Sequence, residues 1–99
     1  MIINFKNMCA NIEEVKINNE PRESCNILCD SVGTIYTNDM KIRGKFAGRL
    51  VCVLSKFGTD PKACFTDNDK AEAFYDFMVE LIKKGEDFVT VDVLEHGAI

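Results

Sequence analysis

A single long helix in the second half of the chain constrains its fold more than any other feature. Apolar side chains recur there at spacings of three and four residues, which is the spacing of one buried helical face. This apolar stripe consists of Ala71, Phe74, Met78, Leu81 and Ile82, with Phe77 beside it. Polar residues 66–69 offer several N-caps, and the sequence Lys-Lys-Gly at residues 83–85 is typical of a helix end. The pattern predicts a helix over residues 67–84.

Strand patterns lie on both sides of this helix. In residues 88–94 after it, valines alternate with other side chains, which predicts a strand. Residues 50–54 before it form a continuous apolar run, which predicts a central strand covered on both faces. Residues 63–65 can return as its partner after a turn at residues 57–62. Earlier short strands are predicted at residues 2–5, 15–17, 25–29, 34–37 and 40–43, with a hairpin turn at Asn38-Asp39 between the last two.

These elements predict one α+β domain over residues 1–99. It consists of an antiparallel β-meander, one long C-terminal helix packed on the meander, and a final strand. Strands that come first and a helix that comes late differ from the regular alternation of a parallel α/β fold. A chain of 99 residues with 46% hydrophobic and 28% charged residues suits a single soluble globular domain.

Neither a membrane span nor a signal peptide is predicted. No apolar run approaches the ~20 residues that a membrane helix needs. The opening residues are too polar for the apolar stretch of a signal peptide. We therefore expect a cytoplasmic protein.

The chain has five cysteines, an odd number at irregular spacing, which is not the pattern of a secreted disulfide scaffold. Cys52 and Cys64 stand among apolar residues and are expected to be buried. Cys25, Cys29 and His96, the one histidine, supply fewer soft ligands than the four of a structural zinc site. We therefore expect reduced thiols, no metal and no cofactor.

No set of residues predicts an enzyme. A cysteine nucleophile would depend on His96 as its base, close to a chain end, where ordering is often poor. The acidic residues fall on an exposed helix face or in turns, where nothing raises a carboxyl pKa for acid–base catalysis. No nucleophile elbow, metalloprotease pair or dinucleotide-binding fingerprint occurs. The expected function is therefore binding, not catalysis.

Basic residues are concentrated in one part of an acidic chain. The formal net charge is −4, yet residues 40–58 hold five basic residues and no acidic one. The candidate ligand-binding residues in this segment are Lys41, Arg43, Lys45 and Arg49. Gly44 and Gly48 between them would let the backbone approach a phosphate closely. One hypothesis is therefore a site for a nucleotide or another phosphorylated ligand within residues 41–56.

The other interpretation of this basic segment is a solvated strand face whose lysines protect a sheet edge. Its spacing matches no phosphate-binding loop, because only three residues separate Gly44 from Gly48 and Arg49 follows. The acidic net charge argues against nucleic acid as a partner, since nucleic-acid-binding domains present a dominant basic face.

The predicted helix carries the opposite charge on one side. Four acidic residues follow one another at spacings of three, four and four, away from the apolar stripe. This acidic stripe consists of Asp69, Glu72, Asp76 and Glu80. One interpretation is a water-facing side. The other is a surface that docks a basic groove of a partner protein or imitates nucleic-acid phosphates, as electrostatic complementarity allows.

The leading hypothesis is a non-enzymatic binding protein that masks a partner protein through this acidic stripe. The alternative is a protein that binds or sequesters a nucleotide or another phosphorylated ligand at the basic segment. A sheet with one covering helix also leaves an open edge or face, so a homodimer is expected.

The start of the chain resembles that of short, uncharacterised accessory proteins from low-G+C bacteria and their phages: Ile2-Ile3-Asn4-Phe5-Lys6-Asn7-Met8. Strands precede a similarly patterned helix in those proteins, which ends in glycine and is followed by a final strand. The resemblance implies a small, β-rich, one-helix cytoplasmic protein that often self-associates. It also implies a bacterial or phage protein that blocks a defence system, by masking a protein or by sequestering a signalling nucleotide.

Overall fold

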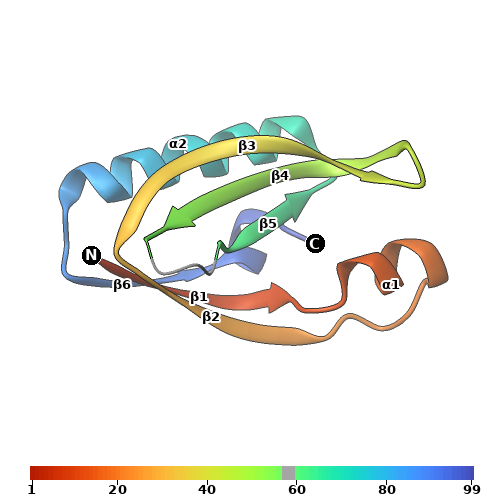
Figure 1. Ribbon diagram of the computed structural model, residues 1–99, viewed down its shortest axis with the longest axis horizontal. Coiled ribbons are helices and arrows are strands. Elements are labelled where there is room, and N and C mark those ends of the chain that lie inside the picture. Colours follow the sequence, from red (N-terminus) through yellow and green to blue (C-terminus); the bar gives the residue numbers. More distant parts are fainter. Residues whose placement is uncertain (57–59) are drawn as a thin grey trace.

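The computed structural model describes residues 1–56 and 60–99, and its elements form two sheets and two α-helices (Figure 1). The elements are β1 (Ile2–Cys9), α1 (Ile12–Asn18), β2 (Ser24–Asp30), β3 (Val32–Ile42), β4 (Lys45–Ser55), β5 (Lys62–Phe65), α2 (Asn68–Lys84), β6 (Phe88–Asp92) and the 3₁₀ turn η1 (Val93–His96). The predicted α+β class, with one long C-terminal helix and a final strand, is confirmed. The predicted turn at residues 57–62 begins with residues 57–59, which lie outside the described residues.

The strands divide between two three-stranded sheets instead of forming one meander. Sheet A has the order β2-β1-β6 and sheet B has the order β3-β4-β5. In sheet A the final strand pairs in parallel with the first, so Ile3 lies opposite Val89. In sheet B all pairs are antiparallel. The predicted central strand is therefore β4, and the predicted partner at residues 63–65 is β5.

A sharp corner at Ser31 joins the two sheets. Ser31 has a positive φ of 52°, so the chain turns from β2 of sheet A directly into β3 of sheet B (Figure 1). Ser55 Oγ donates to the carbonyl of Asp30 at 2.6 Å, and the Lys56 N–H donates to the carbonyl of Ser31 at 3.3 Å. The corner therefore joins two edge strands, β2 of sheet A and β3 of sheet B.

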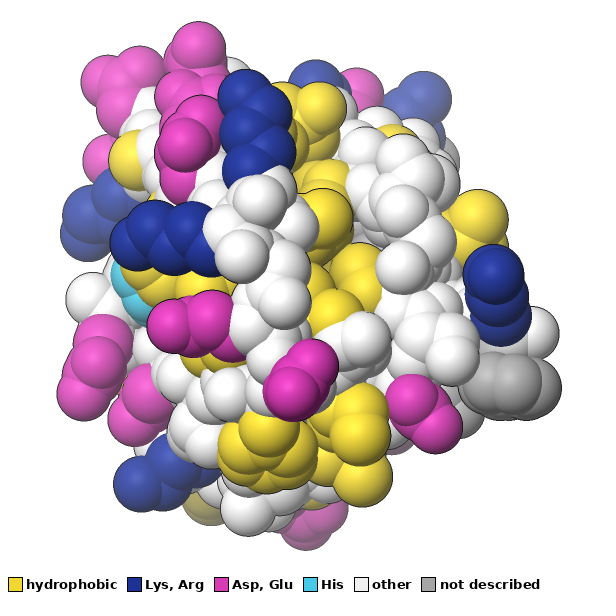
Figure 2. All heavy atoms as spheres, turned by 90° about the vertical axis from the view of Figure 1, so that its left-hand side faces the viewer, with side chains coloured by type: hydrophobic (Ala, Val, Ile, Leu, Met, Phe, Trp, Pro, Cys, Tyr) yellow, Lys and Arg dark blue, Asp and Glu magenta, His cyan; other side chains and the backbone are white. Residues whose placement is uncertain are grey.

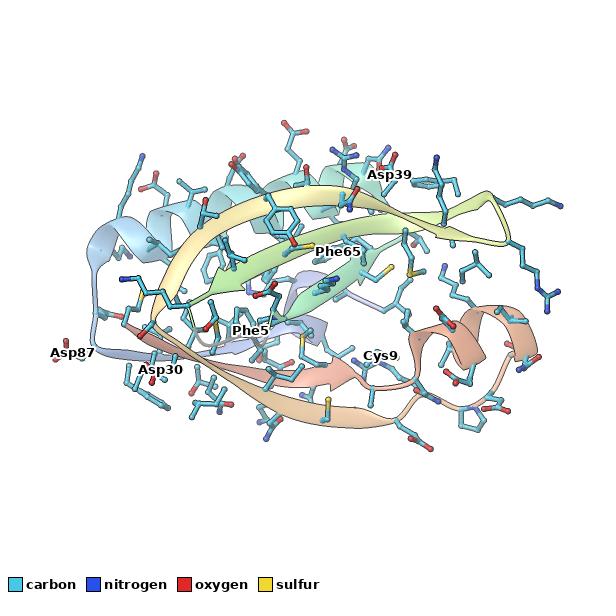
Figure 3. All side chains as sticks on the ribbon, viewed as in Figure 1. Phe5, Cys9, Asp30, Asp39, Phe65 and Asp87 are labelled. Atoms are coloured by element: carbon cyan, nitrogen blue, oxygen red, sulfur yellow. The ribbon has the colours of Figure 1, made fainter. Side chains whose placement is uncertain are left out.

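The core lies between the two sheets and α2. Phe5 from sheet A and Phe65 from sheet B are almost wholly buried in it (Figure 3). The ring of Phe74 in α2 lies 5.3 Å from that of Phe65, at the distance of a favourable aromatic pair. The helix residues buried in this core are Ala71, Phe74, Met78 and Leu81. The predicted apolar stripe therefore packs as expected, although Phe77 beside it is 40% exposed.

Capping residues fix both ends of α2. The Asp67 carboxylate accepts hydrogen bonds from the N–H groups of Asp69 and Lys70, which have no partner inside the helix. Gly85 ends the helix in the left-handed conformation, with φ 67°. The helix thus begins one residue later than predicted and ends where the sequence indicates.

The predicted strand at residues 15–17 is wrong, because these residues lie in α1. Glu13 and Glu14 in the first turn and Lys16 in the last suit the helix dipole. Asn19 then ends the helix with φ 52°. No residue of α1 is buried, so the alternation of Val15 and Ile17, which suggested a strand, reflects no covered face.

The predicted hairpin turn at Asn38-Asp39 is also wrong. β3 continues through these residues, and Asp39 pairs with Arg49 of β4. The turn lies at Arg43 and Gly44, whose φ values are 53° and 77°. Two consecutive positive φ values are what a two-residue hairpin turn of type I′ requires, and glycine adopts them without strain.

Candidate binding groove

The acidic stripe lies on the exposed side of α2, opposite the core. All four of its residues, Asp69, Glu72, Asp76 and Glu80, are exposed. Lys83 shares this side and lies 3.4 Å from Glu80, but both side chains are 68% exposed, so water screens the pair. Among the described residues, the other three acids have no ion pair. Figure 2 shows acidic side chains gathered at the upper part of one end of the molecule, with basic ones beside them.

The structure divides the four candidate ligand-binding residues into two groups. Lys41, Arg43 and Lys45 are exposed around the turn of the β3–β4 hairpin, which extends beyond the N-terminal end of α2 (Figure 1). Arg49 lies farther along β4. It donates to the Asp39 carboxylate at 2.6 Å and to the Thr37 hydroxyl at 3.0 Å. The charge of Arg49 is therefore neutralised inside sheet B, away from the other three.

A groove of about 840 Å³ lies between α2 and β3. Thr37 and Asp39 line it from β3, Glu72 and Tyr75 line it from α2, and Arg49 lines it from β4. Phe46, which is 57% exposed, also lines it. The groove therefore brings together one residue of the acidic stripe and one of the basic segment, which sequence reasoning assigned to different sites.

The pair of Asp39 and Arg49 shapes the groove. The two residues are directly opposite in the β3–β4 register, and their side chains are 44% and 39% exposed. A cross-strand ion pair of this kind contributes about 0.2–1 kcal/mol. The pair also fixes the position of the guanidinium, which it holds against β3 (Figure 3 labels Asp39). Glu72 is then a groove-lining charge that has no ion pair among the described residues.

Sequence reasoning missed the aromatic residues of the groove. Tyr75 lies beside the apolar stripe and is only half-buried, and Phe46 is an exposed aromatic residue next to the hairpin turn. Aromatic residues are enriched at interfaces, and the signal available in the sequence was that Phe46 and Tyr75 lie outside the apolar stripe.

Three of the five cysteines are buried. Cys52 and Cys64 are buried as predicted, and Cys29 is buried as well. Burial raises the pKa of all three thiols, which keeps them protonated and poorly nucleophilic. His96 packs against the rings of Phe74 and Phe77, at 5.0 and 4.5 Å.

Within residues 1–56 and 60–99, no three His, Cys, Asp or Glu residues are grouped so that they could hold a metal ion. Within the same ranges no helix is both long and apolar enough to cross a membrane.

Among the described residues, two of the surfaces open to a second copy of the chain stand out. One is the outer face of sheet A, where Leu28 and Phe88 are each 58% exposed. The other is the outer edge of β3, whose pairing partner within residues 1–56 and 60–99 is β4. The expected homodimer stays a prediction.

Comparisons with protein-family models, with curated proteins and with solved structures each find no match. The resemblance of residues 2–8 to accessory proteins of low-G+C bacteria and phages therefore stays a prediction. The cytoplasmic location stays one too.

Proposed function

We propose that this chain is a binding protein that carries out no chemistry of its own and masks a protein partner. The partner docks along the acidic stripe and into the groove beside it. The observation that carries this proposal is the position of Glu72, which belongs to the acidic stripe and also lines the groove. A charged surface and a concave, partly aromatic surface therefore adjoin.

Each of these surfaces contributes what the other lacks. An acidic helix side alone is well hydrated, and exposed charges mainly speed and orient the encounter with a basic partner. Affinity comes from buried contacts near the centre of an interface, where aromatic residues predominate. Phe46 and Tyr75 supply such contacts in the groove. Masking by stoichiometric contact is the activity that fits this combination, as in an inhibitor of bacterial or phage origin.

The length of the acidic stripe suits a protein surface. Glu80 lies eleven positions after Asp69, and a helix rises about 1.5 Å per residue, so the stripe covers about 16 Å. A charge array of this length matches a row of basic side chains on another protein better than a single small ligand.

The test uses a displayed library of random twelve-residue peptides, selected on the immobilised chain. The tightest peptides are then measured by fluorescence anisotropy against a variant with Asp69, Glu72, Asp76 and Glu80 all changed to Lys. We expect enriched peptides to be basic and the variant to bind them at least 10-fold more weakly.

A matched control reverses the same number of charges elsewhere. Glu13, Glu14, Glu20 and Glu23 are exposed residues of α1 and the following loop, and their change to Lys should leave binding intact. Equal binding by the two variants, or no enriched peptide, would overturn the proposal. Circular dichroism shows whether both variants keep the fold.

A second candidate function is the binding of a nucleotide or another phosphorylated ligand at the hairpin tip. Lys41, Arg43 and Lys45 have no ion pair among the described residues, whereas Arg49 is engaged by Asp39. The test is titration with ATP, GTP, NAD and cyclic dinucleotides while amide NMR signals of residues 41–46 are followed. Shifts that vanish when the three residues are changed to Ala support this function, and no shift at millimolar ligand contradicts it.

A further inference from the structure

We infer that the partner enters the groove as an extended peptide that adds a strand to the free edge of β3. The groove-facing side of this peptide carries a Lys or Arg and an apolar residue, two positions apart. The inference rests on the proposed function and deepens it by naming the partner segment and its binding mode. Strand addition of this kind gives affinity through main-chain hydrogen bonds and specificity through alternate side chains.

The register of sheet B shows which backbone groups are free. The Val53 N–H donates to the carbonyl of Pro61 at 3.0 Å, so the polar groups of Val53 point toward β5. Val53 lies opposite Ile35, and the N–H and C=O of Ile35 therefore point away from β4, to the outer edge. The same alternation directs the backbone groups of Thr37 outward.

Asp39 marks where this free edge ends. Its N–H, the next in the alternation, donates to the side-chain oxygen of Asn38 at 2.9 Å. In the part of the chain that the structure describes, the outer edge of β3 receives no other strand. Ile35 and Thr37 can therefore exchange up to four main-chain hydrogen bonds with an added strand.

The free edge opens onto the groove instead of plain solvent. Ile35, Thr37 and Asp39 all line it, facing α2. The helix runs along β3 on its upper side in Figure 1, so a strand added to the β3 edge would have α2 beside it. An exposed edge without a neighbouring helix would accept any strand. At this edge, the side chains of the added strand that point toward α2 would also contact the groove lining, so their chemistry affects binding.

Two ends of the groove differ in chemistry. Ile35 and Tyr75 also line a second, adjoining cavity, which places them together at one end. Asp39 and Arg49 lie toward the hairpin, and Glu72 lies one helical turn before Tyr75 in α2. A peptide side chain near Ile35 therefore meets an apolar surface, and the next one on the same side of the strand meets Glu72.

The charge balance selects a cation at that second position. Asp39 and Arg49 neutralise one another, so within the described part of the chain Glu72 is the groove-lining charge that has no ion pair. The exposed Asp69 and Asp76 on the same helix add to its negative field. A Lys or Arg of the peptide would be stabilised there, and an acidic residue would be repelled.

A second copy of this chain fits the edge less well than a basic peptide. If two β3 edges paired about a twofold axis, both α2 helices would lie on the same face of the joined sheet. Their groove sides, each with Glu72, would then face one another across the new strand pair. Like charges in such positions disfavour the pairing. A homodimer of this protein would therefore use another surface, such as the outer face of sheet A.

The decisive variant is Thr37→Pro, which removes one outward N–H. Proline is tolerated on edge strands where its missing N–H would face solvent. We expect this variant to bind the tightest selected peptide at least 10-fold more weakly than wild type. Thr37→Val keeps the N–H but loses the hydroxyl that accepts from Arg49, so the loss for Thr37→Pro must exceed that for Thr37→Val. In the complex, the Ile35 amide should exchange with solvent at least 10-fold more slowly.

The matched control is Leu28→Pro on the edge of sheet A. The Ile2 N–H donates to the carbonyl of Asp87, away from β2, so the strand alternation also directs the N–H of Leu28 outward. Leu28 is 58% exposed. This proline should leave peptide binding as in wild type. If Thr37→Pro does not fold, peptides N-methylated at alternate amides replace it, and only one of the two alternating sets should lose affinity.

The outcomes separate this inference from the function on which it rests. If Thr37→Pro binds like wild type while reversal of the acidic stripe abolishes binding, strand addition is wrong and protein docking stands. If neither change matters, both are wrong. If wild type sediments as a dimer that Thr37→Pro converts to a monomer, a second copy occupies the edge and the peptide inference is overturned.

Discussion

The two sheets have the same number of strands but are assembled in opposite ways. Sheet B is made of β3, β4 and β5, which follow one another in the chain and pair in antiparallel fashion. Sheet A pairs β1 with β6, from distant parts of the sequence. Contacts of the second kind form only after a large loop has closed, whereas a hairpin needs its turn and little else. The comparison assigns the long-range part of stability to sheet A, and the open edge that adjoins the groove to sheet B.

The largest expected effect tests the contribution of sheet A to the core. Phe5 is 1% exposed, and Phe5→Ala should lower the free energy of unfolding by about 3–5 kcal/mol, because it removes a buried ring and leaves a cavity. Urea denaturation measures this. Phe88→Ala is the control, since Phe88 is in the same sheet but 58% exposed, and it should change stability far less. A loss below about 1 kcal/mol for Phe5→Ala would show that sheet A contributes little to the stability of the main core.

The next effect concerns the close packing of sheet B at Gly48. A methyl group there would lie 2.6 Å from the Cys64 sulfur and 3.1 Å from the Phe65 carbonyl oxygen. Gly48→Ala should therefore destabilise the protein by about 1–3 kcal/mol through overpacking. Combined with Cys64→Ala, part of this loss should be recovered in thermal unfolding. Strictly additive effects of the two substitutions would show that the sulfur is not the obstacle.

A smaller and opposite effect is expected at the sheet B hairpin. Arg43 has a φ of 53°, which is unfavourable for a long side chain. Arg43→Asn creates the Asn-Gly sequence favoured in type I′ turns and should raise stability by about 0.5–1 kcal/mol. Lys45→Asn, outside the turn, should not stabilise. An unchanged or lower unfolding temperature for Arg43→Asn would contradict this reading of the turn.

The smallest effect is a pH dependence in sheet A. A hydrogen bond from the Asn7 side chain, at 3.0 Å, lowers the pKa of Asp92 below its usual value, and the Leu94 N–H adds to this. Because the folded pKa is the lower one, the stabilisation is complete above the ordinary aspartate pKa and is lost as the pH falls through the folded pKa. Asn7→Ala should raise the Asp92 pKa toward its usual value in a carboxyl NMR titration. Asn4→Ala, on the same strand, should not move it.

The sequence predicted those helices and strands whose residues carry a clear local pattern. The helix at residues 67–84 was identified by its stripe and its glycine stop, and the strand at residues 50–54 was identified by its apolar run. The strand prediction at residues 15–17 was wrong because two alternating apolar residues fit a strand, although these residues lie in α1, which buries neither of them. The turn at Asn38-Asp39 misled because the composition suits a turn, while the ion pair of Asp39 with Arg49 favours a continued strand.

The candidate site was less predictable than the fold. The acidic stripe was found because its members share one helix. The groove was not, since the contact between α2 and β3 is tertiary and no local pattern encodes it. Arg49 looked like a member of the basic segment because only its position along the chain was visible. Its partner Asp39 lies ten residues earlier, just outside that segment.

The parallel pair of β1 and β6 has a consequence for biosynthesis. A ribosome adds roughly 5–20 residues per second, so β1 leaves it several seconds before β6 exists. During that time β1 can pair with β2, but its other edge is empty and the buried side chains of Ile3 and Phe5 lack much of their cover. The hairpin of β3 and β4 can form while the chain grows. The fold is completed only after residues 88–92 have been made, so the inner edge of β1 stays uncovered until synthesis is almost finished.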